Sequence, residues 1–169
     1  MQKRSLAIAI LICMSSPVCM SSPAFAADPS GDWFVADRTA VIRIQPCGEA
    51  MCGTIAWTRE AGTDDKNPDP TKRNQPIVGV TILLGMKPTG EQRWDGDVYN
   101  PEDGKTYVSH MILIDNNALR IEGCVLGGLI CGGERWARAR CDVSGKPNAS
   151  SGTNTPKGAI SCRVESAPK

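Results

Sequence analysis

The chain has few of the residues and motifs from which most enzyme active sites are built. Its one histidine is His110, so a catalytic pair or a zinc site that needs imidazole ligands is poorly supplied. We find no phosphate-binding glycine loop, no Ser–His–Asp set and no pair of carboxylates placed for acid–base work. These absences predict a protein that is not an enzyme. An unrecognised hydrolytic or metal-dependent activity is the alternative.

Charge of either sign is not in excess. The 19 basic residues nearly balance the 18 acidic ones, so no strong field gathers nucleic acid or anionic lipid. Beyond the N-terminus, no stretch is apolar enough for a membrane-spanning helix. We therefore expect no nucleic-acid partner and no membrane span, and the sequence indicates no cofactor and no metal.

The N-terminus carries the features of a secretory signal peptide. Lys3 and Arg4 give a basic start, residues 6–14 form an apolar run, and the segment AFA at 24–26 provides small residues around a cleavage site. The run is too short to span a membrane. We predict a signal peptide at residues 1–26 that is cleaved near Ala26.

A lipid-modified cysteine is the alternative interpretation of this segment. Cys13 follows Ile12 and Cys19 follows Val18, whereas an acylated cysteine is expected to follow a small residue. The sequence therefore favours soluble export over a lipid anchor. We expect a periplasmic or secreted protein.

The remaining chain reads as short strands separated by turns. Glycine and proline are frequent, and no long segment shows the apolar period of 3.6 residues that an amphipathic helix requires. The expected strands are 32–37, 40–45, 52–57, 77–86, 92–100, 106–115, 118–125 and 129–141, and 158–164 is a candidate edge strand. Tight turns such as Asp103-Gly104 join neighbours. The pattern predicts an all-β fold, a closed antiparallel up-and-down barrel of about 8–10 strands.

A polar segment at 58–76 interrupts this regular spacing. It is long for a connection in a compact domain, which predicts either a functional lid or a mobile insert. Asp64, Asp65, Asp69 and Asn67 could supply oxygen ligands to a hard cation. The spacing lacks the glycine and the final glutamate of a calcium loop, and turn formation explains the same residues more simply.

Six cysteines remain after the signal peptide is removed, and an even number in an exported chain indicates disulfides. If Gly127 and Gly128 form a hairpin turn, Cys124 lies directly opposite Cys131, on the outer face of the hairpin. No Cys-x-x-Cys motif favours a redox role. The expected pairs are Cys47 with Cys52, Cys124 with Cys131, and Cys141 with Cys162.

His110 stands in an apolar context. It alternates with Val108, Ile112 and Ile114, so we expect it to face an apolar layer. A single histidine in such a place is more often a hydrogen-bonded core residue than a catalytic base.

Several motifs occur in an order that resembles a family of exported bacterial proteins, a domain of unknown function with a lipocalin- or calycin-like barrel. The motifs are GDW, CGEAMCG, DDKNPD, PIVGVTILLGM, WDGDVYNPEDGKTY, LRIEGC and WAR. The resemblance covers about residues 30 to 140, and the tail with Cys141 and Cys162 lies at or beyond its end. It implies that Trp33 packs against Arg138 and closes the barrel floor, which is a structural role.

Together these observations predict three parts: a signal peptide at 1–26, a barrel at 27–141, and a polar extension at 142–169 that a disulfide ties back. The expected function is to bind an apolar or amphipathic small molecule or a lipid fragment inside the barrel. The alternative is a non-enzymatic interaction or envelope-stress protein that acts through its loops. The candidate lining residues are Trp57, Trp94, Tyr107, Met111, Leu113 and Trp136.

Overall fold

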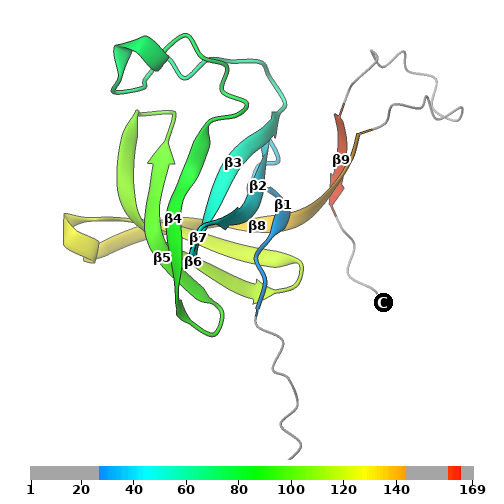
Figure 1. Cartoon of the computed structure of the whole chain (residues 1–169), viewed down its shortest axis with the longest axis vertical. Helices are drawn as coiled ribbons and strands as arrows, with labels where there is room; N and C mark the ends of the chain where they lie inside the picture. Colours follow the sequence, from blue (N-terminus) through cyan, green and yellow to red (C-terminus); the bar gives the residue numbers. More distant parts are fainter. Residues whose placement is uncertain (1–26, 144–159, 165–169) are drawn as a thin grey trace, which may run out of the picture.

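The computed structural model describes residues 27–143 and 160–164 (Figure 1). Within them lie nine strands: β1 Gly31–Phe34, β2 Ala40–Cys47, β3 Ala50–Thr58, β4 Thr81–Gly90, β5 Arg93–Asn100, β6 Lys105–Asp115, β7 Ala118–Val125, β8 Ile130–Val143 and β9 Ile160–Val164. In this part of the chain, no helix is long and apolar enough to cross a membrane. The expected signal peptide falls outside the described residues.

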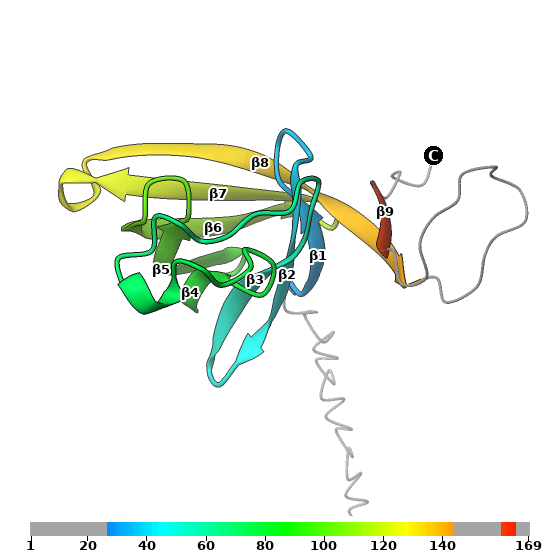
Figure 2. The same cartoon turned by 90° about the horizontal axis from the view of Figure 1, so that it is seen from above.

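The strands form a closed barrel. Each strand from β1 to β8 pairs antiparallel with the next, and β1 also pairs with β8, where Trp33 stands opposite Arg138. Residue pairing therefore runs around a ring of eight strands, and the predicted all-β up-and-down barrel is confirmed. The ninth strand pairs with the end of β8, outside the ring (Figure 2).

Alternating side chains build the barrel wall. In β2, Ile42 and Ile44 are buried, whereas Arg43 between them is exposed and forms an ion pair with Asp32 of β1 at 2.8 Å. This is the period-2 pattern of a strand with one face toward a core. The wall therefore separates an apolar inside from a charged outside.

One strand begins later than the sequence predicts. β4 starts at Thr81, not at Ile77, and it continues to Gly90, beyond the expected end of this strand at residue 86. Gly79 has a φ of 100°, a conformation that breaks an extended strand, and the Val80 amide donates to the Ile77 carbonyl at 3.2 Å. The apolar run therefore begins as a turn before it joins the sheet.

A β-bulge reverses the direction of one tryptophan. Val41 pairs with Trp57 and Ile42 pairs with Ile55, so Ala56 is an extra residue in β3. Strict alternation along residues 52–57 would place Ile55 and Trp57 on one face, but this extra residue shifts the alternation by one, so the predicted lining position of Trp57 was wrong. Trp57 packs instead in a second cluster, edge-on to Phe34 with ring centroids 6.4 Å apart.

The floor of the barrel joins its first and last strands. The Arg138 guanidinium lies 4.1 Å from the centroid of the buried Trp33 ring. Its Nη1 donates to the Ser30 carbonyl at 2.8 Å, and its Nε donates to the Asn116 carbonyl in the β6–β7 turn. The indole Nε1 of Trp33 donates to the Pro29 carbonyl at 2.8 Å. One arginine thus connects three separate segments at this end.

Disulfides join neighbouring strands at three places. Each links two strands that are consecutive in the chain: β2 with β3, β7 with β8, and β8 with β9. The bonded pairs are Cys47–Cys52, Cys124–Cys131 and Cys141–Cys162. The third joins the end of the barrel to the chain beyond residue 159.

Candidate functional site

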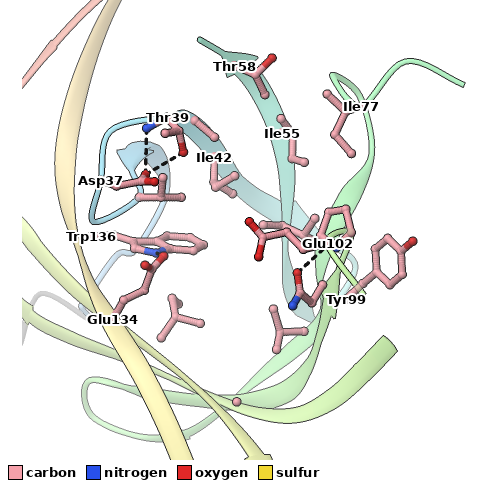
Figure 3. A pocket seen from close by; sticks show the side chains of 18 of the residues that line it. Asp37, Thr39, Ile42, Ile55, Thr58, Ile77, Tyr99, Glu102, Glu134 and Trp136 are labelled. Atoms are coloured by element: carbon pink, nitrogen blue, oxygen red, sulfur yellow. Dashed lines mark hydrogen bonds between the residues drawn. The ribbon is translucent and has the colours of Figure 1, made fainter. Parts of the chain in front are cut away.

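The end of the barrel opposite the floor opens into a cavity of about 1020 Å³ (Figure 3). The turns after β1, β3 and β5 and the ends of β7 and β8 surround its mouth. In an up-and-down barrel these connections all lie at one end, because alternate strands run in opposite directions. The topology alone therefore brings four distant parts of the sequence around one opening.

The inner walls of the cavity are apolar. Side chains from β2, β3, β4, β5, β7 and β8 point inward at this level, because each occupies the inward position of its strand's alternation. They are Ile42, Ile55, Ile82, Val98, Ile121 and Trp136. A space of this size and character suits a small apolar molecule or the tail of an amphiphile.

Carboxylates gather around the mouth. Among the residues that the structure describes, five carboxylates border the cavity, and Arg59 is the only basic residue that does. The guanidinium of Arg59 donates to the backbone carbonyl of Arg38 at 3.1 Å, so it is held on the loop after β1. The acidic residues are Asp37, Glu60, Asp65, Glu102 and Glu134.

Two of these acids are fixed by local hydrogen bonds. Asp37 accepts from the side chain and from the backbone amide of Thr39, and these bonds lower the pKa of its carboxyl group. Glu134 accepts a hydrogen bond from the indole nitrogen of Trp136, two residues along β8. The second contact places a carboxylate directly beside an aromatic ring.

The long β3–β4 loop is attached to the barrel by a buried carboxylate. Asp64 is fully buried and accepts hydrogen bonds from the Tyr99 hydroxyl and from the Asn67 amide nitrogen, each at 2.6 Å. Burial, together with the bond to Asp64, raises the pKa of Tyr99 to about 12. The loop is therefore docked on β5 beside the cavity.

The other loop carboxylates also have local partners. Asp69 accepts from the backbone and hydroxyl of Thr71 and begins the short 3-10 helix Pro70–Lys72. Asp65 forms an exposed ion pair with Lys66. These contacts account for Asp65 and Asp69 by side-chain pairing and turn formation.

The predicted lining residues fall in three places. Tyr107 and Trp136 border the cavity. Trp94, Met111 and Leu113 are buried in the main core, but they do not border the cavity. Trp57 packs on the other side of the wall, beyond the bulge.

The aliphatic residues of the cavity wall are absent from the predicted lining, which consists mainly of aromatic residues. Ile42, Ile55 and Ile121 each lie in a strand with alternating apolar residues, so this signal could have found them. The acids at the mouth lie mostly in turns, where alternation carries no information. Their common location follows from topology alone.

His110 lies on the outer face of β6. Its Nδ1 is 2.8 Å from the Asp95 carboxylate, and a nitrogen of its ring lies within 4.8 Å of the bridged sulfurs of Cys124 and Cys131. Its neighbours in the alternation, Val108 and Ile114, are 50% and 41% exposed. The apolar layer expected around His110 is thus an outer surface, because both faces of β6 are rich in apolar residues.

The fold and cavity define a class of protein: an eight-stranded, lipocalin-like β-barrel that is open at one end. The chain belongs to the family described as "Uncharacterized protein conserved in bacteria (DUF2147)", whose profile matches residues 31–138. The resemblance predicted from the sequence motifs is thereby confirmed.

A solved structure supports the same fold. It is described as "Protein HP1028 from the human pathogen Helicobacter pylori belongs to the lipocalin family". The TM-score is 0.60 at 21% identity, over 66% of this chain and 82% of that one. No curated protein matches the chain. At this level of identity the likeness shows the fold alone.

Proposed function

We propose that this protein binds an apolar or amphipathic small molecule, such as a lipid fragment, inside its barrel and does not act as an enzyme. The observation that carries the proposal is the cavity of about 1020 Å³ with walls of isoleucine, valine and tryptophan. Ligand cavities of soluble proteins have volumes of roughly 300–1,000 Å³ and mainly apolar walls. A barrel filled by its own side chains would have no such space.

The disulfides support an extracytoplasmic location. Three cystines persist most readily in an oxidising compartment, such as the periplasm or the medium outside the cell. We therefore propose that the chain is exported by a signal peptide at 1–26, and that the polar extension at 142–169 is held to the barrel through Cys162. Edman sequencing of the protein purified from cells tests the first point, because it should begin near residue 27.

The lining residues support a binding role. In the described part of the chain, neither histidine nor cysteine borders the cavity, so the nucleophile–base pairs that use these residues are not assembled from it. The proposed ligand contacts are the aliphatic wall together with Tyr107 and Trp136. The four other candidates from the sequence would support this wall from the core or from outside.

Native mass spectrometry tests the proposal directly. Protein purified gently from its own cells should carry an added mass that organic extraction removes. Gly123 borders the cavity and a β-carbon built there has its nearest neighbour at 3.5 Å, so Gly123→Phe should fill the space and abolish the adduct. Val108→Phe, on the exposed outer face, is the matched control and should retain it. A bare wild-type protein that also fails to bind dodecanol would overturn the proposal.

One observation favours protein contact as a second candidate function. The β7–β8 hairpin ends in four exposed apolar residues: Val125, Leu126, Leu129 and Ile130. Clusters of this kind are typical of interaction sites. A photo-crosslinker at Leu129 should then capture a defined protein in cells, and Leu126→Ser should abolish the capture without changing dodecanol binding. Absence of a specific crosslink would remove this candidate.

A further inference from the structure

We propose that the cavity selects amphiphiles with a cationic head, such as a long-chain amine or ammonium, over anionic amphiphiles of the same length. The inference rests on the proposed function, because it assigns the chemical class of the molecule that the cavity binds. Its basis is the combination of an apolar interior, an acidic mouth and an aromatic ring between them.

The mouth is far more acidic than the protein. The whole chain has a formal net charge of +1. The described residues bordering the cavity include five carboxylates and one guanidinium, which is a formal charge of −4, and Asp65 among them forms an exposed ion pair with Lys66. A concave site with low-dielectric walls concentrates the field of such charges, so it attracts cations and repels anions. Backbone carbonyls of Asp37 and Arg38 hold the Arg59 guanidinium on the loop after β1, and its one positive charge leaves the carboxylates in excess.

Two carboxylates stand on facing walls. Glu102 comes from the β5–β6 turn and Glu134 from β8, and Figure 3 shows the Glu102 carboxylate pointing into the cavity toward Trp136. Among the described residues, no lysine or arginine forms an ion pair with either of them. An ammonium group between the two walls would provide the missing positive charge.

Trp136 lies where such a head group would meet the apolar interior. Its indole nitrogen donates to Glu134, which fixes the carboxylate beside the ring. A cation near an indole face gains further electrostatic attraction from the ring. Tyr107 also borders this space. The arrangement provides both contacts that an alkylammonium head prefers: a carboxylate and an aromatic ring.

Calorimetric titration of the full chain with three dodecyl probes tests the inference: dodecylammonium, dodecyl sulfate and dodecanol, each below its aggregation concentration. We expect dodecylammonium to bind about tenfold or more tightly than dodecyl sulfate at low salt, and the difference to shrink as salt is added. The double variant E102Q/E134Q should lose this preference and retain dodecanol binding, which also reports that the barrel is intact. Glu91→Gln, in the β4–β5 turn at the floor end, is the matched control and should keep the preference.

The outcomes separate the two proposals. Equal binding of the cationic and anionic probes, tighter binding of dodecyl sulfate, or a preference that persists in E102Q/E134Q would overturn the charge selectivity and leave the cavity's binding role intact. Failure of all three probes to bind wild-type protein would overturn both.

Discussion

Single residues connect parts of this molecule that the chain keeps far apart. Asp64 attaches a long loop to β5, and Arg138 connects β8 to the N-terminal segment and to a distant turn. The sequence motifs implied the pairing of Trp33 with Arg138. They gave no sign that Asp64 is buried, because an aspartate in a run of turn residues is usually solvated.

Tyr99 should make stability depend on alkaline pH. Its pKa is raised from 10.0 to about 12, so the folded state favours the protonated phenol. This contribution is fully present below pH 10 and is lost as the pH rises through about 12.

The tyrosinate absorbance of the Tyr107→Phe variant measures this titration directly, because the chain contains only two tyrosines. We expect a midpoint near 12 in the folded protein and one near 10 in denaturant. An ordinary midpoint in the folded protein would contradict the buried contact with Asp64.

Arg138→Ala should destabilise the barrel by about 2–4 kcal/mol. The change removes a cation–π contact and charge-assisted hydrogen bonds to two backbone carbonyls, which are contributions of this order. Urea denaturation followed by tryptophan fluorescence checks the value. Arg135→Ala, an exposed position on the same strand, should change stability by less than about 0.5 kcal/mol. Similar losses in the two variants would show that the floor contact has no special role.

Elements of the barrel are regular except where one extra residue or one tight turn changes their course. The bulge at Ala56 turns Trp57 outward, and Gly79 delays the start of β4. Neither the bulge nor the late start of β4 interrupts the apolar pattern of the sequence, so the pattern gives no sign of them. Sequence alternation therefore predicted the strands well, but it could not place a side chain beyond an irregularity.

The β7–β8 hairpin should loosen locally when its disulfide is removed. The loop closed by Cys124 and Cys131 is short, with a sequence separation of 7, so the chain-entropy model gives a loss of about 2.5 kcal/mol. In C124A/C131A we expect faster amide exchange near residues 123–132, while Met111 and Leu113 in the core remain protected. C47A/C52A is the control, since its effect should stay in the β2–β3 hairpin. Uniformly faster exchange throughout the barrel would contradict this view.

Gly104 should prove intolerant of a side chain. Its φ is 70°, and a β-carbon there would lie 1.9 Å from the Lys66 carbonyl oxygen of the β3–β4 loop. Gly104→Ala must therefore separate the loop from the β5–β6 turn, with a loss of about 2 kcal/mol or more. Thermal denaturation measures the loss. Gly48 has the same φ of 70° but open space around it. The loss of stability in Gly48→Ala therefore measures the cost of the backbone conformation alone, without a steric clash.

The barrel is packed with side chains at its floor and open at its mouth. The strand pattern and the motif order were enough to predict a closed barrel. They were not enough to predict a cavity, because a strand's inward residues look the same in sequence whether they meet across the barrel or leave a space. That difference depends on summed side-chain volumes and on the paired glycines Gly123 and Gly132, which leave the wall without side chains at this level.

Occupancy of the cavity should stabilise the fold. A molecule that binds only the native state at about 100 times its dissociation constant adds about 2.7 kcal/mol. Dodecylammonium should therefore raise the thermal midpoint of wild-type protein and leave that of Gly123→Phe unchanged. Equal shifts in the two proteins would indicate binding elsewhere.

The pairing of β1 with β8 also constrains how the protein is made. Ser30 and Arg138 are 108 residues apart, so the intervening hairpins can form one by one during synthesis, but the ring cannot. Until the ribosome has released the segment that carries Arg138, the Trp33 indole lacks its cation–π partner. The barrel is then still open, and its apolar lining faces solvent. A truncated or stalled chain would therefore be a natural client for chaperones and proteases.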